Sequence, residues 1–531
     1  TLARPVMRGE SLSVELYDNH DRLLRRVESP GTGVTYDFTL DGVEPLGTSY
    51  HRVLVSVLDR HGLLAQKALP LAIRRHDRPA FHLAAWSEPE TDYLAGLSYR
   101  ALRQLGVDAV FYRADRGQRE AAAEALARAD LFGAPSYPSH HPKPREGAAG
   151  REHEHSLVDP GYLAEIKQQA IASAGPFAPW GILFHPSGSD VRMGGQDFRP
   201  ETLVAFRQWL QPRYESLDAL NQAWGTSFAS WEAIVPDTLE RAKELKRYGS
   251  WLEHTRFMEH AFTEFQRQVK ADLEAIDPGA LMGEDGYGRL DAYDGADWWQ
   301  LLGVFGFYNL YTYQDPPQIE ITRSLVPEFP NVKLRSLYYG SYDGQFGNET
   351  FLKLLPWQAA FHGYNGLFWW VANGKTTYPG SEGVMLGPDF RPTRSFLWSK
   401  DGLDELKGGL SDLLAEAQRA HDGVAIYYDQ TSVHAVAALE HPSALVGQLT
   451  GLQAALEDLG LQYDYVAAQQ IEAGRLTQGG YRVLILPRAL ALSPAVVTQL
   501  RGFVAAGGKL LADPLPGQYD LLLHRLDASP V

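Results

Sequence analysis

Between residues 81 and 373, short apolar segments alternate with segments of helical pattern, and this alternation constrains the fold more than any other feature. Eight apolar segments have the length and composition of buried strands: 81–86, 107–113, 131–138, 180–186, 280–285, 305–313, 332–342 and 366–373. Strands that alternate with helices form parallel sheets covered by helices, and eight of them over about 300 residues are typical of a (β/α)8 barrel. We therefore predict an α/β fold with a (β/α)8 TIM barrel at residues 78–420.

Different patterns flank the predicted barrel. Residues 1–77 contain alternating segments separated by turn signals, which predicts an N-terminal β-sandwich-like domain. The predicted strands there are 12–17, 34–40, 52–58 and 66–74. Residues 421–531 alternate strands and helices again, with the spacing of a C-terminal flavodoxin-like α/β domain. Such a domain usually needs more residues than remain, so we expect both end domains to be incomplete.

Composition excludes several classes of function. The formal net charge of the 531 residues is -16, which argues against a nucleic-acid partner because no basic surface would release phosphate counterions. The chain has no cysteine, which excludes disulfides, thiolate metal sites and a cysteine nucleophile. No apolar run approaches the roughly 20 residues of a membrane helix, and no signal-peptide pattern opens the chain. We expect a soluble, bacterial-type protein, cytoplasmic or extracytoplasmic, without cofactor, metal or membrane partner.

In a (β/α)8 barrel the chemistry takes place at the carboxyl ends of the strands. Carboxylates and aromatic residues gather at these positions in the sequence. The candidate catalytic residues are Asp190, Glu284, Asp285 and Asp343. The candidate substrate-binding residues are Trp86, Glu88, His185, Tyr311, Tyr313, Tyr339, Trp369 and Trp370. This combination is typical of carbohydrate chemistry, in which one carboxyl group protonates the leaving oxygen and a second attacks or stabilises the anomeric carbon.

Two strand ends contain adjacent candidates that cannot both face the barrel mouth. Neighbours on a strand point to opposite faces, so only one of Glu284 and Asp285 should face the pocket. The same argument predicts that one of Trp369 and Trp370 faces the pocket while the other packs under the helices. A structural role for the acids stays open, in which one of them caps the next helix or pairs with Arg289.

Three segments carry a resemblance to a known family. The stretch RPETLVAFRQWLQPRYESLDALNQAWGTSFASWEAIVPDTL (199–239) resembles the region after the fourth strand in glycoside hydrolase family 42. KLLPWQAAFHGYNGLFWWVAN (353–373) resembles the passage into the last barrel strand, and 423–513 resembles the flavodoxin-like trimerisation domain of that family. The resemblance implies a clan-A-type barrel, a retaining β-galactosidase ancestry and a homo-oligomer, either a trimer or a dimer.

The sequence departs from the family at its two catalytic glutamates. The fourth strand, ILFHPSGSD (182–190), has no Glu, so Asp190 would take the place of the acid/base. At the seventh strand, RSLYYGSYDG (335–344), the carboxylate nearest the expected nucleophile is Asp343. Asp is about one methylene shorter than Glu, which is usually costly for a displacement reaction, so Asp285 stays an alternative second carboxylate.

Two functions from different classes remain. The first is a glycoside hydrolase that acts on a β-linked glycan by a two-carboxylate mechanism and takes a carbohydrate substrate. The second is a non-catalytic carbohydrate-binding or scaffold protein on the same barrel. Fold alone does not choose between them, because one fold hosts many functions.

Overall fold

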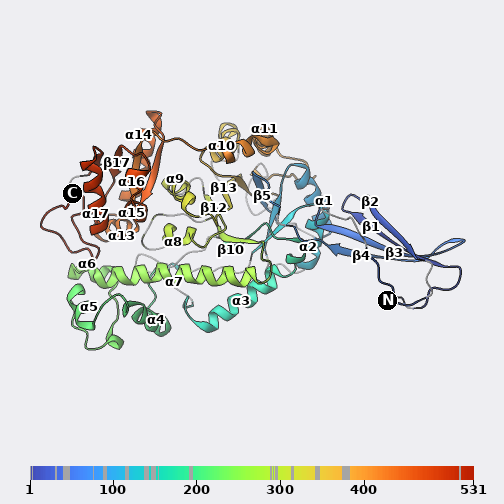
Figure 1. Ribbon diagram of the computed structural model, residues 1–531, viewed down its shortest axis with the longest axis horizontal. Helices are drawn as coiled ribbons and strands as arrows, with labels where there is room; N and C mark the ends of the chain where they lie inside the picture. Colours follow the sequence, from blue (N-terminus) through green and yellow to red (C-terminus); the bar gives the residue numbers. More distant parts are fainter. Residues whose placement is uncertain are drawn as a thin grey trace.

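The computed structural model arranges the chain as an N-terminal sheet, a central barrel and a C-terminal α/β region (Figure 1). It describes residues 2, 4–29, 33–39, 48–75, 77–87, 92–113, 119–136, 143–144, 151–152, 155–189, 195–286, 290, 292, 297–311, 316–340, 347–373, 383–513 and 516–531. The long helix α7 (Gly249–Glu274) runs beneath the barrel and reaches the C-terminal region (Figure 1).

Eight parallel strands form the central barrel. They are β5 (His82–Trp86), β6 (Ala109–Arg113), β7 (Phe132–Ser136), β10 (Phe184–Ser189), β11 (Leu281–Asp285), β12 (Phe307–Tyr311), β13 (Leu334–Gly340) and β14 (Gly366–Trp370). Their order is β10-β11-β12-β13-β14-β5-β6-β7, and a parallel bridge between Gly133 and Ile182 joins the two ends. The predicted (β/α)8 barrel is confirmed, with each strand inside or overlapping its predicted segment.

Helices surround the strands on the outside of the barrel. They include α1 (Asp92–Gln104), α2 (Arg119–Arg128), α3 (Pro160–Ala174), α8 (Trp298–Leu302), α9 (Pro316–Leu325), α10 (Glu349–Phe361), α11 (Arg394–Glu405) and α12 (Ser411–Glu416). Three further helices, α4 (Pro200–Leu210), α5 (Leu217–Trp224) and α6 (Leu239–Leu245), pack against α7 instead. Several begin at the cap that their sequence encodes. Asp159 accepts a hydrogen bond from the Tyr162 amide at the start of α3, and Ser216 caps α5 in the same way.

Alternation along the strands divides the barrel into an inner and an outer core. The inner core is aromatic and includes Trp86, Phe111, Phe184, Phe307, Tyr338 and Phe368. The outer core lies between strands and helices and includes Leu83, Val110, Met282, Tyr308, Tyr339 and Trp369. Glycines make room for large neighbours inside the barrel. A Cβ at Gly366 would lie 2.0 Å from the buried His82 ring, so this position excludes any larger residue unless the ring moves.

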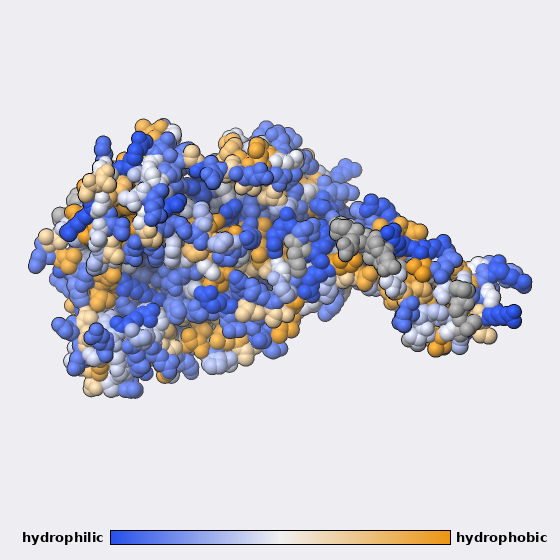
Figure 2. Space-filling view, viewed as in Figure 1, coloured by the Kyte–Doolittle hydropathy of each residue, from blue (hydrophilic) through white to orange (hydrophobic). Residues whose placement is uncertain are grey.

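The N-terminal region forms one antiparallel sheet in the described residues, and Figures 1 and 2 show it projecting from the barrel. Its strands are β1 (Ser11–Asp18), β2 (Leu23–Ser29), β3 (Tyr50–Asp59) and β4 (Gly62–Ala72), in the order β2-β1-β3-β4. The predicted strand at 34–40 is wrong, because 35–39 have no strand structure. β2 was not predicted, because its exposed Arg25 and Arg26 interrupt the alternation that marks a half-buried strand.

The C-terminal region is a parallel four-stranded sheet with helices. Its strands are β15 (Val424–Tyr428), β16 (Tyr463–Ala467), β17 (Val483–Leu486) and β18 (Lys509–Ala512), in the order β16-β15-β17-β18. Its helices are α13 (Gln430–Leu439), α14 (Ser443–Asp458), α15 (Ala468–Glu472), α16 (Arg475–Gln478) and α17 (Pro494–Ala505). If these four strands are numbered 1 to 4 in chain order, their order in the sheet is 2-1-3-4, which matches the first four strands of a flavodoxin-like sheet.

Candidate active site

Asp285 and Asn309 form the polar centre of the inner face at the carboxyl ends of the strands. Asp285 ends β11 and pairs in register with Asn309 of β12. The Asn309 side-chain amide donates a hydrogen bond of 2.8 Å to Asp285 Oδ1, and both residues are buried. The amide fixes the orientation of the carboxylate. The sequence analysis did not single out Asn309, although its register beside Asp285 and its aromatic neighbours in FYNLY mark the same level of the barrel.

Aromatic side chains line the inner face around this pair. Trp86 stacks on Phe111 with ring centroids 3.9 Å apart, and Trp370 lies tilted against Trp86 at 4.8 Å. On the other side, Tyr311 stacks on Tyr338 at 5.0 Å. Tyr311 and Trp370 are the partly exposed members, whereas the others are buried. Their flat apolar faces are suited to the apolar faces of sugar rings.

Four of the predicted site residues lie on the outer face of the barrel instead. Glu284 pairs with Tyr308 and His185 pairs with Met282, and both partners belong to the outer core. Tyr339 and Trp369 pack edge to face at 4.6 Å in the same layer. For His185 and Tyr339, the expectation that the side chain faces the pocket is wrong. Glu284 and Trp369 are the outward members of their pairs, so one residue of each pair faces inward as alternation predicted.

Burial sets the chemistry of His185. The ring is inaccessible to solvent, and its Nδ1 lies 3.0 Å from the Pro186 carbonyl oxygen. Burial lowers the pKa of His185 to about 3, because the imidazolium would lose its hydration. His185 is therefore neutral near pH 7 and belongs to the core.

Four further predicted residues lie outside the described residues: Glu88, Asp190, Tyr313 and Asp343. Their roles therefore stay predictions. On the described part of the barrel strands, Asp285 is the one carboxylate that faces inward.

One acid that the sequence analysis missed has a raised pKa. Asp297 caps α8, accepting hydrogen bonds from the backbone amides of Trp299 and Gln300. Burial and the nearby charge of Glu259 raise the pKa of Asp297 to about 6. A capping residue before a helix is the ordinary structural role of Asp, and the signal was the sequence DWWQLL.

Within the described residues, no group of three or more His, Cys, Asp or Glu side chains has the arrangement of a metal site. None of the helices in the described part of the chain is long and apolar enough to cross a membrane.

A family model described as β-galactosidase, that of glycoside hydrolase family 42, matches residues 182–328. This range contains β10, β11 and β12, and therefore Asp285 and Asn309. The β-galactosidase BglY of Alicyclobacillus acidocaldarius is 22% identical over 405 residues, which cover 70% of this chain and 56% of BglY. The chain is a relative of the family 42 β-galactosidases.

Further comparisons define the extent of this relationship. The β-galactosidase BbgII of Bifidobacterium bifidum is 24% identical over 388 residues, 64% of this chain and 52% of BbgII. The chain thus spans about half the length of the curated relatives it matches. The crystal structure of the β-galactosidase from Rahnella sp. R3 superposes with a TM-score of 0.68 at 18% identity, covering 86% of this chain and 74% of that one. This likeness shows that the two chains share a fold.

Proposed function

We propose that this family 42 relative is a glycoside hydrolase that cleaves a β-linked glycan at the mouth of its barrel. The observation that carries the proposal is the buried Asp285 carboxylate, oriented by Asn309 at the carboxyl end of β11. Active sites of (β/α)8 barrels lie at this end of the strands. The similarity to β-galactosidases supports a β-galactoside as the first substrate to test.

The proposed mechanism uses two carboxyl groups. Asp285 acts as the nucleophile or the base, with Asp343 as the alternative for this role. Asp190 acts as the acid, donating a proton to the glycosidic oxygen as the bond to the anomeric carbon breaks. A separation of about 5 Å between the two carboxyl groups would give retention of configuration, and about 6.5–9.5 Å would give inversion. The partly exposed Trp370 and Tyr311 supply stacking surfaces for the sugar, and the buried Trp86 packs against Trp370.

The alternative is a carbohydrate-binding protein without catalysis. It is favoured by one observation, namely that Asp285 is the one inward carboxylate on the described part of the barrel strands. A single carboxylate with an aromatic wall binds sugar hydroxyls and ring faces, but it lacks the partner that hydrolysis requires. Sugar binding without turnover would support this alternative.

A hydrolysis screen separates the two functions. We expect the protein to release the aryl group from at least one aryl β-glycoside in a panel that includes β-galactosides. The Asp190→Asn variant should lose cleavage of natural oligosaccharides, whose poor leaving groups need a proton, while activated aryl glycosides lose less. If Asp190→Asn cleaves a natural oligosaccharide at the parental rate, Asp190 is not the acid.

We further propose that the C-terminal flavodoxin-like region mediates a homo-oligomer, a trimer or a dimer. The support is its resemblance to the trimerisation domain of family 42. Sedimentation at micromolar concentration should give a mass of two or three chains, and a mass of one chain, 59.0 kDa, would contradict this.

A further inference from the structure

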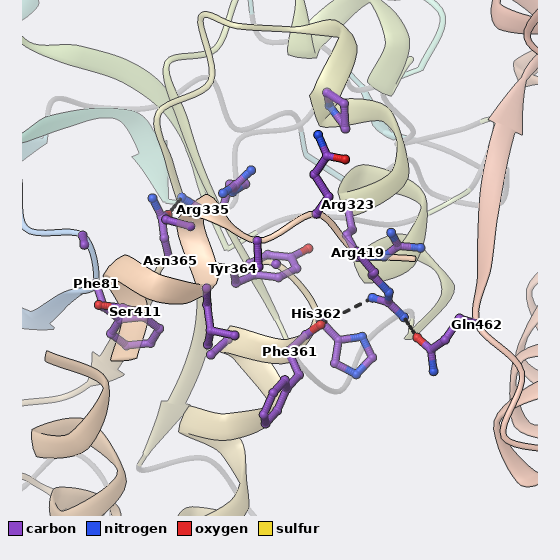
Figure 3. A pocket seen from close by; sticks show the side chains of 18 of the residues that line it. Phe81, Arg323, Arg335, Phe361, His362, Tyr364, Asn365, Ser411, Arg419 and Gln462 are labelled. Carbon is purple, nitrogen blue, oxygen red and sulfur yellow. Dashed lines mark hydrogen bonds between the residues drawn. The ribbon is translucent and has the colours of Figure 1, made fainter. Parts of the chain in front are cut away.

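A cavity of about 940 Å³ lies at the opposite end of the barrel from the proposed active site. Its walls come from the N-terminal ends of β13 and β14 and from the C-terminal region, including Arg335, Asn365 and Gln462 (Figure 3). Strands of five to seven residues span roughly 17–23 Å, so this cavity is separated from the barrel mouth by the length of the strands. Ligands that enter here do not contact Asp285.

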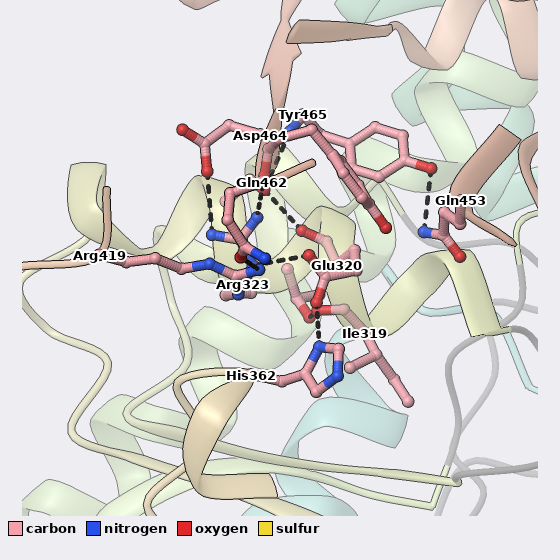
Figure 4. A network of polar contacts seen from close by, with 12 residues as sticks. Ile319, Glu320, Arg323, His362, Arg419, Gln453, Gln462, Asp464 and Tyr465 are labelled. Atoms are coloured by element: carbon pink, nitrogen blue, oxygen red, sulfur yellow. Dashed lines mark hydrogen bonds and ion pairs between the residues drawn. The ribbon is translucent and has the colours of Figure 1, made fainter. Parts of the chain in front are cut away.

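One end of the cavity is electrostatically balanced. The Arg323 guanidinium donates to Glu320 Oε2 at 2.8 Å, to Asp464 Oδ1 at 2.9 Å and to the Tyr463 carbonyl oxygen at 2.8 Å (Figure 4). His362 Nδ1 contacts the other oxygen of Glu320. Burial raises the pKa of Glu320, but the hydrogen bond from His362 and the charge of Arg323 outweigh it and lower this pKa to about 2. This end therefore needs no additional anion.

Two other arginines at the cavity make no hydrogen bond to a carboxylate among the described residues, although the charge of Arg419 also interacts with Glu320 and Asp464. Arg419 donates to Gln462 Oε1 at 2.7 Å and to the Phe361 carbonyl oxygen at 3.4 Å, both of which are neutral (Figure 3). The side chain of Arg335 makes no hydrogen bond or ion pair with any described residue, and its Nε is buried. A buried donor without an acceptor is unfavourable, and a guanidinium offers several donors that match the oxygens of an anion.

The remaining walls of the cavity are suited to an organic molecule. Phe361 is 61% exposed, and Tyr364 and Leu414 also line the cavity. Glu457 is the one carboxylate among the described lining residues, and it accepts a hydrogen bond from the Tyr463 hydroxyl at 3.0 Å. The volume lies within the range of about 300–1,000 Å³ that small-molecule sites occupy.

We propose that this cavity binds a small organic oxyanion, a phosphate ester or a carboxylate, through Arg335 and Arg419, with its apolar part against Phe361. Guanidinium groups bind both kinds of oxyanion through charge-assisted hydrogen bonds. The site is distinct from the proposed active site and does not depend on the glycosidase proposal. Because the cavity walls belong to both the barrel and the C-terminal region, the ligand joins these two regions.

Calorimetry with phenyl phosphate, benzoate and phenol tests the proposal on the full chain. Phenol controls for the apolar part, since it has the same ring without the oxyanion. We expect phenyl phosphate or benzoate to bind more tightly than phenol, and the better of the two identifies the anion. Arg335→Gln and Arg419→Gln should each weaken this binding about tenfold or more, as expected for loss of a charge-assisted hydrogen bond. Arg391→Gln, at a side chain that is 85% exposed and does not line the cavity, is the matched control.

Thermal melting without ligand shows whether the variants fold. Arg335→Met should melt at or above the parental temperature, because the substitution removes a buried donor that has no acceptor among the described residues. The same variant should lose anion binding. Absence of binding by both anions, binding equal to that of phenol, or binding that survives both Gln variants would overturn the proposal.

Discussion

The inner and outer faces of the barrel contain chemically similar residues in opposite settings. Asp285 and Glu284 are sequence neighbours, yet the first faces inward beside Asn309 and the second faces the outer core beside Tyr308. Trp370 and Trp369 divide in the same way. At these strand ends, a shift of one residue therefore separates a site position from a core position.

Accordingly, the two faces should respond differently to substitution. An outer-face side chain is enclosed by strands and helices, so its loss should lower the free energy of unfolding. An inner-face side chain at the barrel mouth contributes to the site, so its loss should lower binding or turnover with a smaller effect on stability.

The tryptophan pair gives the largest expected effect on stability. Trp369 is buried, donates to the Gly383 carbonyl oxygen at 3.1 Å and packs on Tyr339 and Phe396. Trp369→Ala should therefore lower the free energy of unfolding by about 3–5 kcal/mol, as large-to-small core substitutions of Trp do. Trp370→Ala should cost less, because Trp370 is partly exposed. Chemical denaturation of both variants measures the difference.

Sugar binding distinguishes the same two tryptophan variants by a second measurement. Trp370→Ala should weaken binding of the substrate identified in the hydrolysis screen, because it removes a stacking surface next to Trp86. Equal losses of stability in the two variants, with unchanged binding in Trp370→Ala, would contradict the assignment of faces.

The loss of folding stability in acid should come in part from His185 on the outer face of the barrel. The pKa of His185 in the folded protein is about 3, below its ordinary value of 6.5. Between these values the unfolded chain binds a proton that the folded protein excludes, so stability is lost as the pH falls below about 6.5. The contribution of His185 should be about 1.4 kcal/mol per pH unit within this window.

His185→Gln isolates this contribution. The free energy of unfolding of the variant should fall less steeply with acid than that of the parent between about pH 6 and pH 4. The slope is the measured quantity, so a uniform loss of stability in the variant does not affect the comparison. Identical slopes would show that His185 is accessible to protons in the folded protein.

The smallest effect concerns the partner of Asp285. Asn309→Ala removes the amide that donates to Asp285 Oδ1, and the carboxylate loses one hydrogen bond that favours its ionised form. Turnover should fall about tenfold, and the acidic limb of the pH–rate profile should move to higher pH. A fall in turnover with an unmoved acidic limb would assign Asn309 to packing alone.

The barrel was predictable because each strand is a compact apolar segment, such as FHLAAW and GLFWWVAN, followed by a helical pattern. The rule of alternation also predicted that only one of Glu284 and Asp285 faces the pocket. It did not say which, because the phase of alternation depends on how each strand is placed in the barrel. The inward orientation of Asp285 follows from its pairing with Asn309 on the next strand, and Asn309 is 24 residues away in the sequence.

The residues that were predicted to face the pocket but lie in the outer core were misplaced for one physical reason. Tyr339 and His185 have polar groups, and polar groups at strand ends suggest a site. In the structure, burial under the helices gives both a core role instead. The cavity around Arg335 was not predictable either, because its walls come from separate segments spread between residues 80 and 463.

If the inner face at the carboxyl end of β11 performs the chemistry, substitution of Asp285 should lower turnover far more than substitution of its outward neighbour Glu284. Hydrolysis of an aryl β-galactoside, or of the best substrate in the screen, is compared for the parent, Asp285→Asn and Glu284→Gln at equal concentrations of folded protein. Asp285→Asn should lose about a thousandfold in turnover, and Glu284→Gln should stay within about threefold of the parent. Near-parental turnover in Asp285→Asn, or the larger loss in Glu284→Gln, would contradict the account.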